Sequence, residues 1–264
     1  MIKIVQHSSN PVTMINELKV SEHFYSIQGE GQTAGRPAVF LRLSSCNLMC
    51  GGQGTEKDKR LHNGATWRCD SIESWIHGER YSRDELSVML IEKYMYQFKH
   101  GSHLIVTGGE PLLQQKMLVQ VLEDVKAVFP HLYIEVETNG TLEPSPELRT
   151  HTNLFNVSPK LTNSGMPVGR RIAEGPLAKL RFAAAAEQAI FKFVVSDAVD
   201  WAEVEADFVR PFDIPRNRIW LMPASDKRSD IKDTWSLVAE IAKRQRVNFS
   251  PRLQVAIWDK TTGV

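Results

Sequence analysis

The chain has 264 residues, of which 42% are hydrophobic and 24% charged, and its formal net charge is +1. These values are typical of a soluble globular protein, and the length suits one large α/β domain or two small ones. The charge balance gives no support for a broad nucleic-acid or membrane surface, and no apolar run approaches a membrane span. Since Met1 to Lys19 also lacks the features of a signal peptide, we expect a cytosolic protein.

Short apolar runs along the chain predict buried strands. They are Ala38–Leu43, Leu104–Val106, Tyr133–Val136, Leu154–Val157, Ile190–Val195, Ile219–Met222 and Leu253–Trp258. Helical patterns lie between many of them, at Arg83–Phe98 (with a capping box of Ser82 and Glu85), Leu112–Val128, Ala198–Val209 and Ile231–Arg244. This alternation predicts a parallel sheet, and at this length a partial or complete (β/α) barrel is expected.

Two stretches interrupt the alternation. From Ser44 to Tyr81 no convincing strand or long helix is visible, and a loop of that length inside a compact domain is usually functional. Ser164–Lys179 is rich in Gly, Pro and Arg and is expected to be a surface insertion. We therefore predict a single domain over residues 1–264, with an N-terminal extension at 1–19 and a ligand-binding loop at 44–81.

All three cysteines of the chain, Cys46, Cys50 and Cys69, lie in that loop. In a reducing compartment such a group indicates metal binding or catalysis rather than disulfides. Thiolates suit zinc or iron–sulfur clusters. Three thiolates on a four-iron cluster leave one iron without a protein ligand, which is what a radical S-adenosylmethionine (SAM) enzyme needs.

A structural zinc site is the alternative on the cysteines alone. Zinc usually takes four ligands, and His62 in the same loop could supply the fourth. The spacing argues against it, because three residues separate Cys46 from Cys50 and eighteen separate Cys50 from Cys69. Common zinc knuckles pair their cysteines closely at both ends.

The residues around the cysteines resemble the 7-carboxy-7-deazaguanine synthase family of radical SAM enzymes. The resemblance rests on the following segments: Phe24-Tyr25-Ser26-Ile27-Gln28-Gly29-Glu30-Gly31, Phe40-Leu41-Arg42-Leu43, Cys46-Asn47-Leu48, Cys69-Asp70-Ser71, Thr107-Gly108-Gly109-Glu110-Pro111, Glu137-Thr138-Asn139-Gly140 and Ser158-Pro159-Lys160. It runs in order from Glu22 to the C-terminus and is more specific in the N-terminal half.

The resemblance implies an incomplete (β/α) TIM-like barrel of the radical SAM type with an enlarged cluster-binding loop after the first strand. It implies a lyase that converts 6-carboxy-5,6,7,8-tetrahydropterin to 7-carboxy-7-deazaguanine and ammonia, on the route to queuosine and related deazapurines. The implied cofactors are a [4Fe-4S] cluster on the three cysteines, SAM that is cleaved to a deoxyadenosyl radical and regenerated, and Mg²⁺. A homodimer and an electron donor such as flavodoxin are the implied partners.

The chain departs from the family pattern at several positions. The third cysteine usually follows the second after two residues, so Gly51–Arg68 is interpreted as an insertion within the motif. An aromatic residue that packs on adenine often precedes the last cysteine, whereas here Arg68 has that place and Trp67 precedes it. Ser71 replaces a usual threonine, and Gln254 lies where many members have histidine.

For SAM, the resemblance implies contacts at the ends of the predicted strands, where barrel ligands bind. Gly109 and Glu110 would hold the methionine end, although Gly-Gly alone would favour an ordinary strand–helix turn. The remaining expected contacts are Trp67, Arg68, Ser158, Pro159, Lys160, Met222, Ala224 and Ser225. For the two proline-containing segments, simple strand termination is the alternative.

For the pterin, the resemblance implies that Gln28, Gly29 and Glu30 bind the amino-pyrimidinone edge, and that Ile27 and Thr107 also bind the substrate. A carboxylate can accept two adjacent N–H groups, although a polar turn would explain the same residues. Arg42 alternates with Leu41 and Leu43 on a strand, so it faces away from them and needs an anion. That anion is either the substrate carboxylate or an internal salt-bridge partner.

Two further site residues are implied. Ser71 would supply an oxygen ligand to Mg²⁺, or would instead cap a short helix over Ile72–His77. Val264 or its carboxylate would close the substrate pocket. The rival functions are another radical SAM reaction, such as activation of a glycyl-radical enzyme, and a non-catalytic zinc-binding adaptor.

Overall fold

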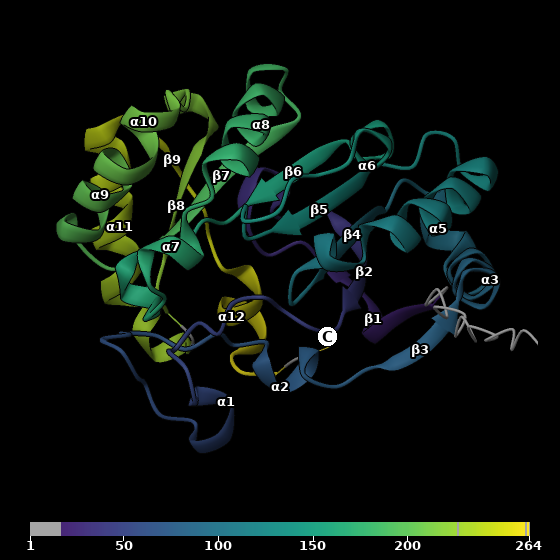
Figure 1. The fold of residues 1–264 in the computed structure, drawn as a ribbon, viewed down its shortest axis with the longest axis horizontal. Helices are drawn as coiled ribbons and strands as arrows, with labels where there is room; N and C mark the ends of the chain where they lie inside the picture. The colour runs from purple at the N-terminus through teal and green to yellow at the C-terminus, as the bar shows by residue number, and fades with distance from the viewer. Residues whose placement is uncertain (1–16, 226, 262, 264) are drawn as a thin grey trace, which may run out of the picture.

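A computed structural model describes residues 17–225, 227–261 and 263. In this part of the chain nine strands form one sheet in the order β3-β1-β2-β4-β5-β6-β7-β8-β9 (Figure 1). Their bounds are β1 (Glu17–Ile27), β2 (Pro37–Leu43), β3 (Glu79–Ser82), β4 (His103–Gly108), β5 (Ile134–Thr138), β6 (Leu154–Val157), β7 (Ala189–Val195), β8 (Ile219–Pro223) and β9 (Asn248–Phe249).

Strand β1 pairs antiparallel with β2 and β3, whereas the neighbours from β2 through β9 are all parallel. The carboxyl ends of the parallel strands therefore meet at one edge, which is where such sheets bind ligands. Among the described residues β3 and β9 are the outer strands, so the barrel is incomplete, as the resemblance implied.

Helices cover the outer face of the sheet. In Figure 1, α3, α5 and α6 lie beside the β4–β6 half, and α8 to α11 lie beside the β7–β9 half. The helices are α1 (Thr55–Asp58), α2 (Ile72–Trp75), α3 (Arg83–Lys93), α4 (Met95–Lys99), α5 (Gln115–Val128), α6 (Pro146–His151), α7 (Val168–Arg171), α8 (Glu174–Ala185), α9 (Ala198–Val204), α10 (Arg210–Phe212), α11 (Ile231–Gln245) and α12 (Leu253–Trp258), with a π-helical turn η4 (Glu205–Val209) and short 3₁₀ turns that include η1 (Gly31–Thr33) and η2 (Pro111–Gln114). Within the described ranges, no helix is both long and apolar enough to cross a membrane.

Different clusters of buried side chains pack against the two faces of the sheet. Phe155 belongs to the large core between sheet and helices, whereas its neighbour Leu154 packs with Ile190 and Trp220 in a separate small cluster. Because successive strand residues point to opposite faces, this small cluster fills the inside of the barrel. Polar residues follow two positions further along the same strands, at Asn156 and Lys192, so the barrel interior becomes polar toward its carboxyl edge.

The structure confirms six of the predicted strands within two residues at each end. The capping box is also present, since Ser82 Oγ accepts the Glu85 amide and the Glu85 carboxylate accepts the Ser82 amide. The predicted helix Arg83–Phe98 is divided at Tyr94 into α3 and α4.

The prediction of a strand at Leu253–Trp258 is wrong, because these residues form helix α12. The last strand is β9, which pairs with β8 through only Asn248 and Phe249. Pro251 follows two residues later and has no N–H to extend a ladder, so the chain leaves the sheet there. The apolar run then forms a short helix beside the segment that follows β1, where the Leu253 amide donates to the Gly29 carbonyl.

The first strand and the second irregular stretch also differ from the predictions. Strand β1 begins at Glu17, so residues 17–19 belong to the sheet rather than to an extension, and the cluster loop follows the second strand. The sequence does not predict β1, because most of this strand is only half-buried and it carries polar residues on both faces. Within Ser164–Lys179, residues from Glu174 onward form α8, whose Leu177 and Leu180 are buried at helical spacing.

Candidate active site

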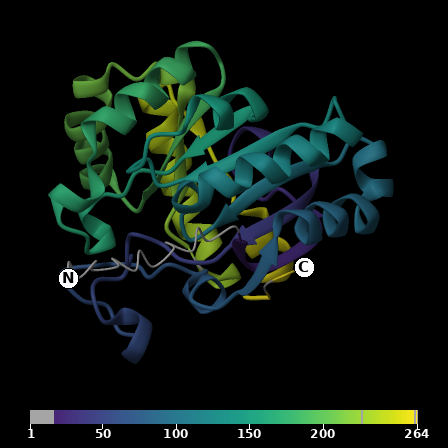
Figure 2. The same ribbon diagram turned by 45° about the vertical axis from the view of Figure 1, so that its right-hand side comes forward.

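The cysteine loop follows β2 and returns on itself. The Cys69 amide donates to the Cys50 carbonyl at 3.1 Å, so the two cysteines are adjacent although eighteen residues separate them. The insertion Gly51–Arg68 therefore begins and ends at one place. It includes the short helix α1, and it projects from the barrel as the dark blue segment at the lower left of Figure 2. His62 lies within it and bonds to Asp58 at 3.0 Å rather than to a cysteine.

The three thiols share one electrostatic environment. Burial raises the pKa of Cys46 to about 11 and that of Cys50 to about 12, and it also raises the pKa of Cys69. Cys46 and Cys50 are each made harder to ionise by the neighbouring cysteines. Thiols of this kind become thiolates when a metal supplies positive charge, so the donor set fits an iron–sulfur cluster. In such a cluster each thiolate binds a different iron. Within the described part of the chain, no group of three or more His, Cys, Asp or Glu side chains is arranged to hold a single metal ion.

The Thr107–Pro111 turn at the end of β4 packs directly on the cysteine loop. A Cβ atom on Gly109 would lie 2.1 Å from the Ser45 carbonyl oxygen and 2.8 Å from Cys46 Cβ, so only glycine fits there. The Glu110 amide donates to the same Ser45 carbonyl at 2.9 Å. The glycine turn thus fixes the backbone that carries the first cysteine.

The Glu110 side chain is completely buried, and burial raises its pKa. It accepts hydrogen bonds from the amides of Asn139 (2.7 Å) and Leu112 (3.1 Å) and from Thr138 Oγ1 (2.9 Å). Asn139 in turn directs its Nδ2 toward Cys46 Sγ at 4.0 Å. Glu110 therefore ties the ends of β4 and β5 together beneath the cysteine loop, and a contact of this residue or Gly109 with SAM stays a prediction.

The segment after β1 enters the barrel from its open side. The Gly31 amide donates to Ser250 Oγ at 2.8 Å, and the Gly29 carbonyl accepts from the Leu253 amide at 3.0 Å. Gly31 has a φ of +69°, and a Cβ there would lie 3.2 Å from Asn156 Oδ1. Residues 29–31 and 250–253 thus form one wall of the interior together. Ile27 is the last residue of β1 before that wall.

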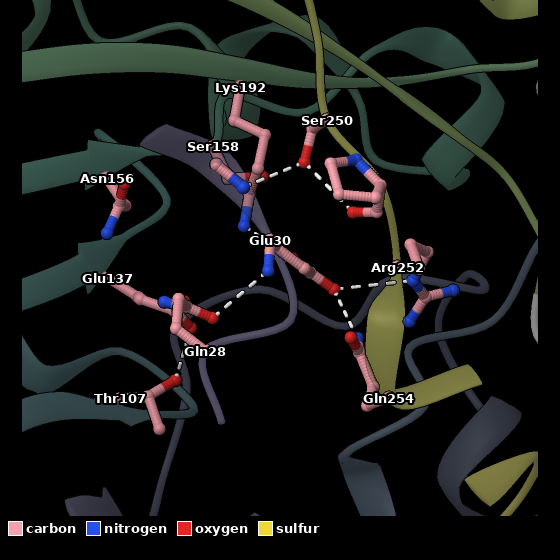
Figure 3. A network of polar contacts seen from close by, with 12 residues as sticks. Gln28, Glu30, Thr107, Glu137, Asn156, Ser158, Lys192, Ser250, Arg252 and Gln254 are labelled. Atoms are coloured by element: carbon pink, nitrogen blue, oxygen red, sulfur yellow. Dashed lines mark hydrogen bonds and ion pairs between the residues drawn. The ribbon is translucent and has the colours of Figure 1, made fainter. Parts of the chain in front are cut away.

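Glu30 is the centre of the interior network (Figure 3). Its carboxylate accepts from Lys192 Nζ at 2.5 Å, Gln254 Nε2 at 2.6 Å and Arg252 Nε at 3.3 Å. Burial alone would raise the pKa of Glu30, but the charges of Lys192 and Arg252 outweigh burial and hold it at about 2. Glu30 is therefore an anion fixed between two buried cations.

A second group of polar residues lies beside Glu30 (Figure 3). Glu137 accepts from Thr107 Oγ1 at 2.7 Å and from Gln28 Nε2 at 3.4 Å, and Gln28 Oε1 accepts the Glu30 amide at 3.2 Å. Nearby, Asn156 Oδ1 and Gln254 Oε1 are buried without a hydrogen-bond partner among the described residues. A buried acceptor without a donor is unfavourable, so the interior has acceptors available for a ligand with several N–H groups.

Arg42 pairs with Glu22 across the β1–β2 ladder, and its Nε lies 2.6 Å from Glu22 Oε1. Of the two anions considered from the sequence, the structure thus contains the internal salt-bridge partner, Glu22. Gly263 also reaches this place, since a Cβ on it would lie 3.5 Å from Glu22 Oε2. Val264, expected to close the pocket, lies outside the described residues.

Ser71 follows the last cysteine. Its hydroxyl donates to Asp70 Oδ1 at 2.9 Å and makes no capping bond to α2, although Ser71 occupies the N-cap position. Asp70 also binds the Arg252 guanidinium through its other oxygen. The hydroxyl and carboxylate together are hard oxygen donors of the kind Mg²⁺ prefers, and the role of Ser71 as a ligand stays a prediction.

The residues expected to bind SAM lie along the carboxyl edge, and their contacts with it stay predictions. Lys160 donates to Ser158 Oγ at 2.8 Å, and its charge favours ionisation of all three cysteines. Pro159 is buried, as are Met222 and Ser225, while Ala224 is half-buried. Trp67 donates to Asn163 Oδ1 at 2.8 Å, and Arg68 pairs with Glu73 at 2.8 Å.

Four residues of the candidate site are not predicted from the sequence as site residues. They are Asp70, Glu137, Lys192 and Arg252. Lys192 had a usable signal, because a lone lysine within an apolar strand needs a buried anion, by the same reasoning that was applied to Arg42. Glu137 alternates with buried Val136 and Thr138 in β5. Arg252 gave no signal, since its partners come from segments 182 and 222 positions away.

An incomplete barrel of mostly parallel strands, with three thiols at its carboxyl edge and a glycine turn against the first cysteine, defines a radical SAM enzyme. Residues 27–157 match a family described as a 4Fe-4S single cluster domain. The chain is 34% identical to a 7-carboxy-7-deazaguanine synthase from Pyrobaculum aerophilum, covering 93% of this chain and 97% of that one. The corresponding enzyme from Halobacterium salinarum is 31% identical over 92% and 91%. The chain therefore belongs to the 7-carboxy-7-deazaguanine synthase family.

The fold agrees with that assignment. The crystal structure of QueE from Escherichia coli superimposes with a TM-score of 0.60 at 24% identity, covering 92% of this chain and 98% of that one. At that identity the likeness establishes the architecture, and the roles of individual residues depend on the geometry described above.

Proposed function

We propose that this chain produces 7-carboxy-7-deazaguanine and ammonia from 6-carboxy-5,6,7,8-tetrahydropterin, in queuosine or related deazapurine biosynthesis. The observation that carries the proposal is the interior network around Glu30. A carboxylate ionised by two buried cations, with Gln28 and Glu137 beside it, offers hydrogen-bond acceptors to the N–H groups of an amino-pyrimidinone ring.

The residues divide into three regions around that ring. Cys46, Cys50 and Cys69 would hold the [4Fe-4S] cluster, and when bound, the cluster and SAM would supply the radical that starts the reaction. Arg42 would bind the pterin carboxylate, exchanging Glu22 for it. Ser71 would contribute a ligand to Mg²⁺ beside that carboxylate. Beneath the ring, the Leu154–Ile190–Trp220 cluster would exclude water from the closed end of the barrel.

The test is anaerobic turnover of 6-carboxytetrahydropterin with SAM, dithionite and Mg²⁺, with product detected by mass spectrometry. Product should form only when SAM is present, and the Cys46→Ala variant is the matched control. Cleavage of SAM without any deazapurine product, with the pterin recovered unchanged, would instead favour another radical SAM reaction such as activation of a glycyl-radical enzyme.

The partners complete the proposal. An electron donor such as flavodoxin would reduce the cluster, and the chain would act as a homodimer in the cytosol. Replacing dithionite with flavodoxin and its reductase tests the first, and light scattering of the purified protein tests the second.

A further inference from the structure

Arg252 lies just before α12 and is almost completely buried. Each nitrogen of its guanidinium contacts a different segment. Nε donates to Glu30 Oε1 at 3.3 Å, Nη1 donates to the Ser225 carbonyl, and Nη2 donates to Asp70 Oδ2. One side chain therefore joins the segment after β1, the segment after β8 and the cysteine loop.

The three segments have different tasks in the proposed function. Glu30 would bind the pterin ring, Ser225 ends the β8 segment expected near SAM, and Asp70 stands between the cluster ligand Cys69 and the Mg²⁺ candidate Ser71. Asp70 is itself exposed apart from this contact, so Arg252 is its main tether to the barrel interior. In the described structure Arg252 is the residue that bridges Glu30 and Asp70 directly.

The Glu30 carboxylate is heavily used in this structure. Lys192 occupies Oε2, while Gln254 and Arg252 both approach Oε1. A carboxylate oxygen has two lone pairs, so a ring that donates two N–H groups to Glu30 competes with Arg252, whose bond at 3.3 Å is the longest. Occupation of Glu30 by substrate would release Nε and leave the guanidinium held by Asp70 and Ser225.

From this geometry we infer that Arg252 is a positioning residue that couples occupation of the pterin site to the placement of the cluster loop. The inference rests on the proposed function. Its consequence is that a pterin on Glu30 leaves the guanidinium to Asp70 and Ser225 alone. The firmer hold on Asp70 then stabilises the adjacent Cys69–Ser71 backbone, so that SAM is cleaved when the ring is in place. A lysine cannot reproduce this bridge, because it lacks the planar fork that reaches three acceptors at once.

The test uses the reconstituted enzyme and the variants Arg252→Lys and Asp70→Asn. The first readout is hydrogen–deuterium exchange of the peptide covering residues 66–75, with and without pterin in the presence of SAM. The second is the ratio of deoxyadenosine released to deazapurine formed, with dithionite as reductant. In wild type, pterin should slow exchange of the peptide and the ratio should be low.

In both variants we expect the pterin-dependent protection to be lost and the ratio to rise at least about fivefold, the lower end of ordinary coupling between sites. The double variant should be no worse than either single variant, because all three remove the same bridge. Arg218→Lys is the matched control, since this buried arginine pairs with Glu187 at the opposite end of β8 and should behave as wild type.

The outcomes separate the inference from the proposed function. If wild type forms no deazapurine, the proposed function fails. If wild type forms it and Asp70→Asn keeps both the protection and the ratio, the coupling role of Arg252 is wrong. Asp70→Asn keeps the test decisive if Arg252→Lys does not fold, because the Asp70 side chain is about half exposed and its substitution leaves Arg252 paired with Glu30.

Discussion

Gly29 and Gln254 are in such close contact that a Cβ atom on Gly29 would lie 1.8 Å from Gln254 Oε1. The overlap involves the far end of a flexible side chain, so Gly29→Ala can be accommodated by moving Gln254 away from Glu30. We expect the variant to fold and to show a raised apparent constant for the pterin.

Steady-state kinetics of Gly29→Ala check this, and Gly175→Ala is the control, since a Cβ there would meet nothing within 4 Å. Shortening the colliding side chain in the double variant Gly29→Ala/Gln254→Ala should remove the overlap, so the two substitutions should be strongly non-additive. Additive effects would show that Gln254 is not what Gly29 accommodates.

The cysteines are expected to hold about four irons and four sulfides per chain after anaerobic reconstitution, as a cubane cluster requires. Replacing any one of Cys46, Cys50 and Cys69 with alanine should abolish SAM cleavage. Iron and sulfide analysis checks this, with His62→Ala as a control that should keep its cluster. Stoichiometric zinc without iron in anaerobic preparations would contradict the cluster assignment.

Ser71→Ala should lower turnover, with partial recovery at raised Mg²⁺, whereas Ser71→Thr should stay active because threonine keeps the hydroxyl. The hydroxyl contacts Asp70 and does not cap α2, so the alanine variant should unfold at the same temperature as wild type. Activity titrated with Mg²⁺ measures the effect. The same Mg²⁺ dependence in wild type and Ser71→Ala would remove Ser71 from the metal site.

Arg42 should discriminate between a pterin with and without its carboxylate. Arg42→Ala and Arg42→Lys are expected to keep cluster and SAM and to lose pterin turnover, since loss of a buried charge-assisted pair costs about 2–5 kcal/mol. Because Glu22 holds Arg42 in the free protein, Glu22→Gln should leave pterin affinity equal or higher. If Arg42→Ala weakens binding of both pterins equally, the arginine serves only its pairing with Glu22.

Glu30 should make stability depend on pH in the acid range. Its pKa falls from 4.5 to about 2 on folding because Lys192 and Arg252 outweigh the effect of burial. A carboxylate with a lowered folded pKa stabilises the fold above its unfolded pKa, and that contribution disappears as the pH falls through the folded pKa. The difference corresponds to about 3 kcal/mol.

We therefore expect Glu30→Gln to be less stable than wild type by about 3 kcal/mol near pH 7, with a gap that narrows steadily below pH 4.5. Urea unfolding of both proteins from pH 7 to pH 3 measures the gap. A gap that is constant over this range would show that the Glu30 charge is not what the two cations stabilise.

Secondary structure is best predicted from the sequence where a segment is buried on both of its faces. Leu154–Val157 was predicted with its observed bounds, because an apolar run buried on both faces identifies an inner strand. The prediction is wrong at Leu253–Trp258, where the apolar run forms a helix. Its apolar composition is that of a strand, but Pro251 ends the pairing with β8 just before it. For the candidate site, sequence motifs predict the cysteines and Glu30. The cations beside Glu30 come from β7 and from just before α12, and no local pattern connects segments so far apart.

The wall made by the Gly31–Ser250 hydrogen bond joins residues 219 positions apart. Contacts of such long sequence separation form late, because a long loop must close before they contribute stability. During synthesis the chain could pair its strands through β8 before residues 248–258 emerge from the ribosome, yet it would have no Arg252 or Gln254 beside Glu30. Assembly of the pterin site would thus be the final step of folding, and a protein clipped after α11 would keep its three cysteines while lacking a place for its substrate.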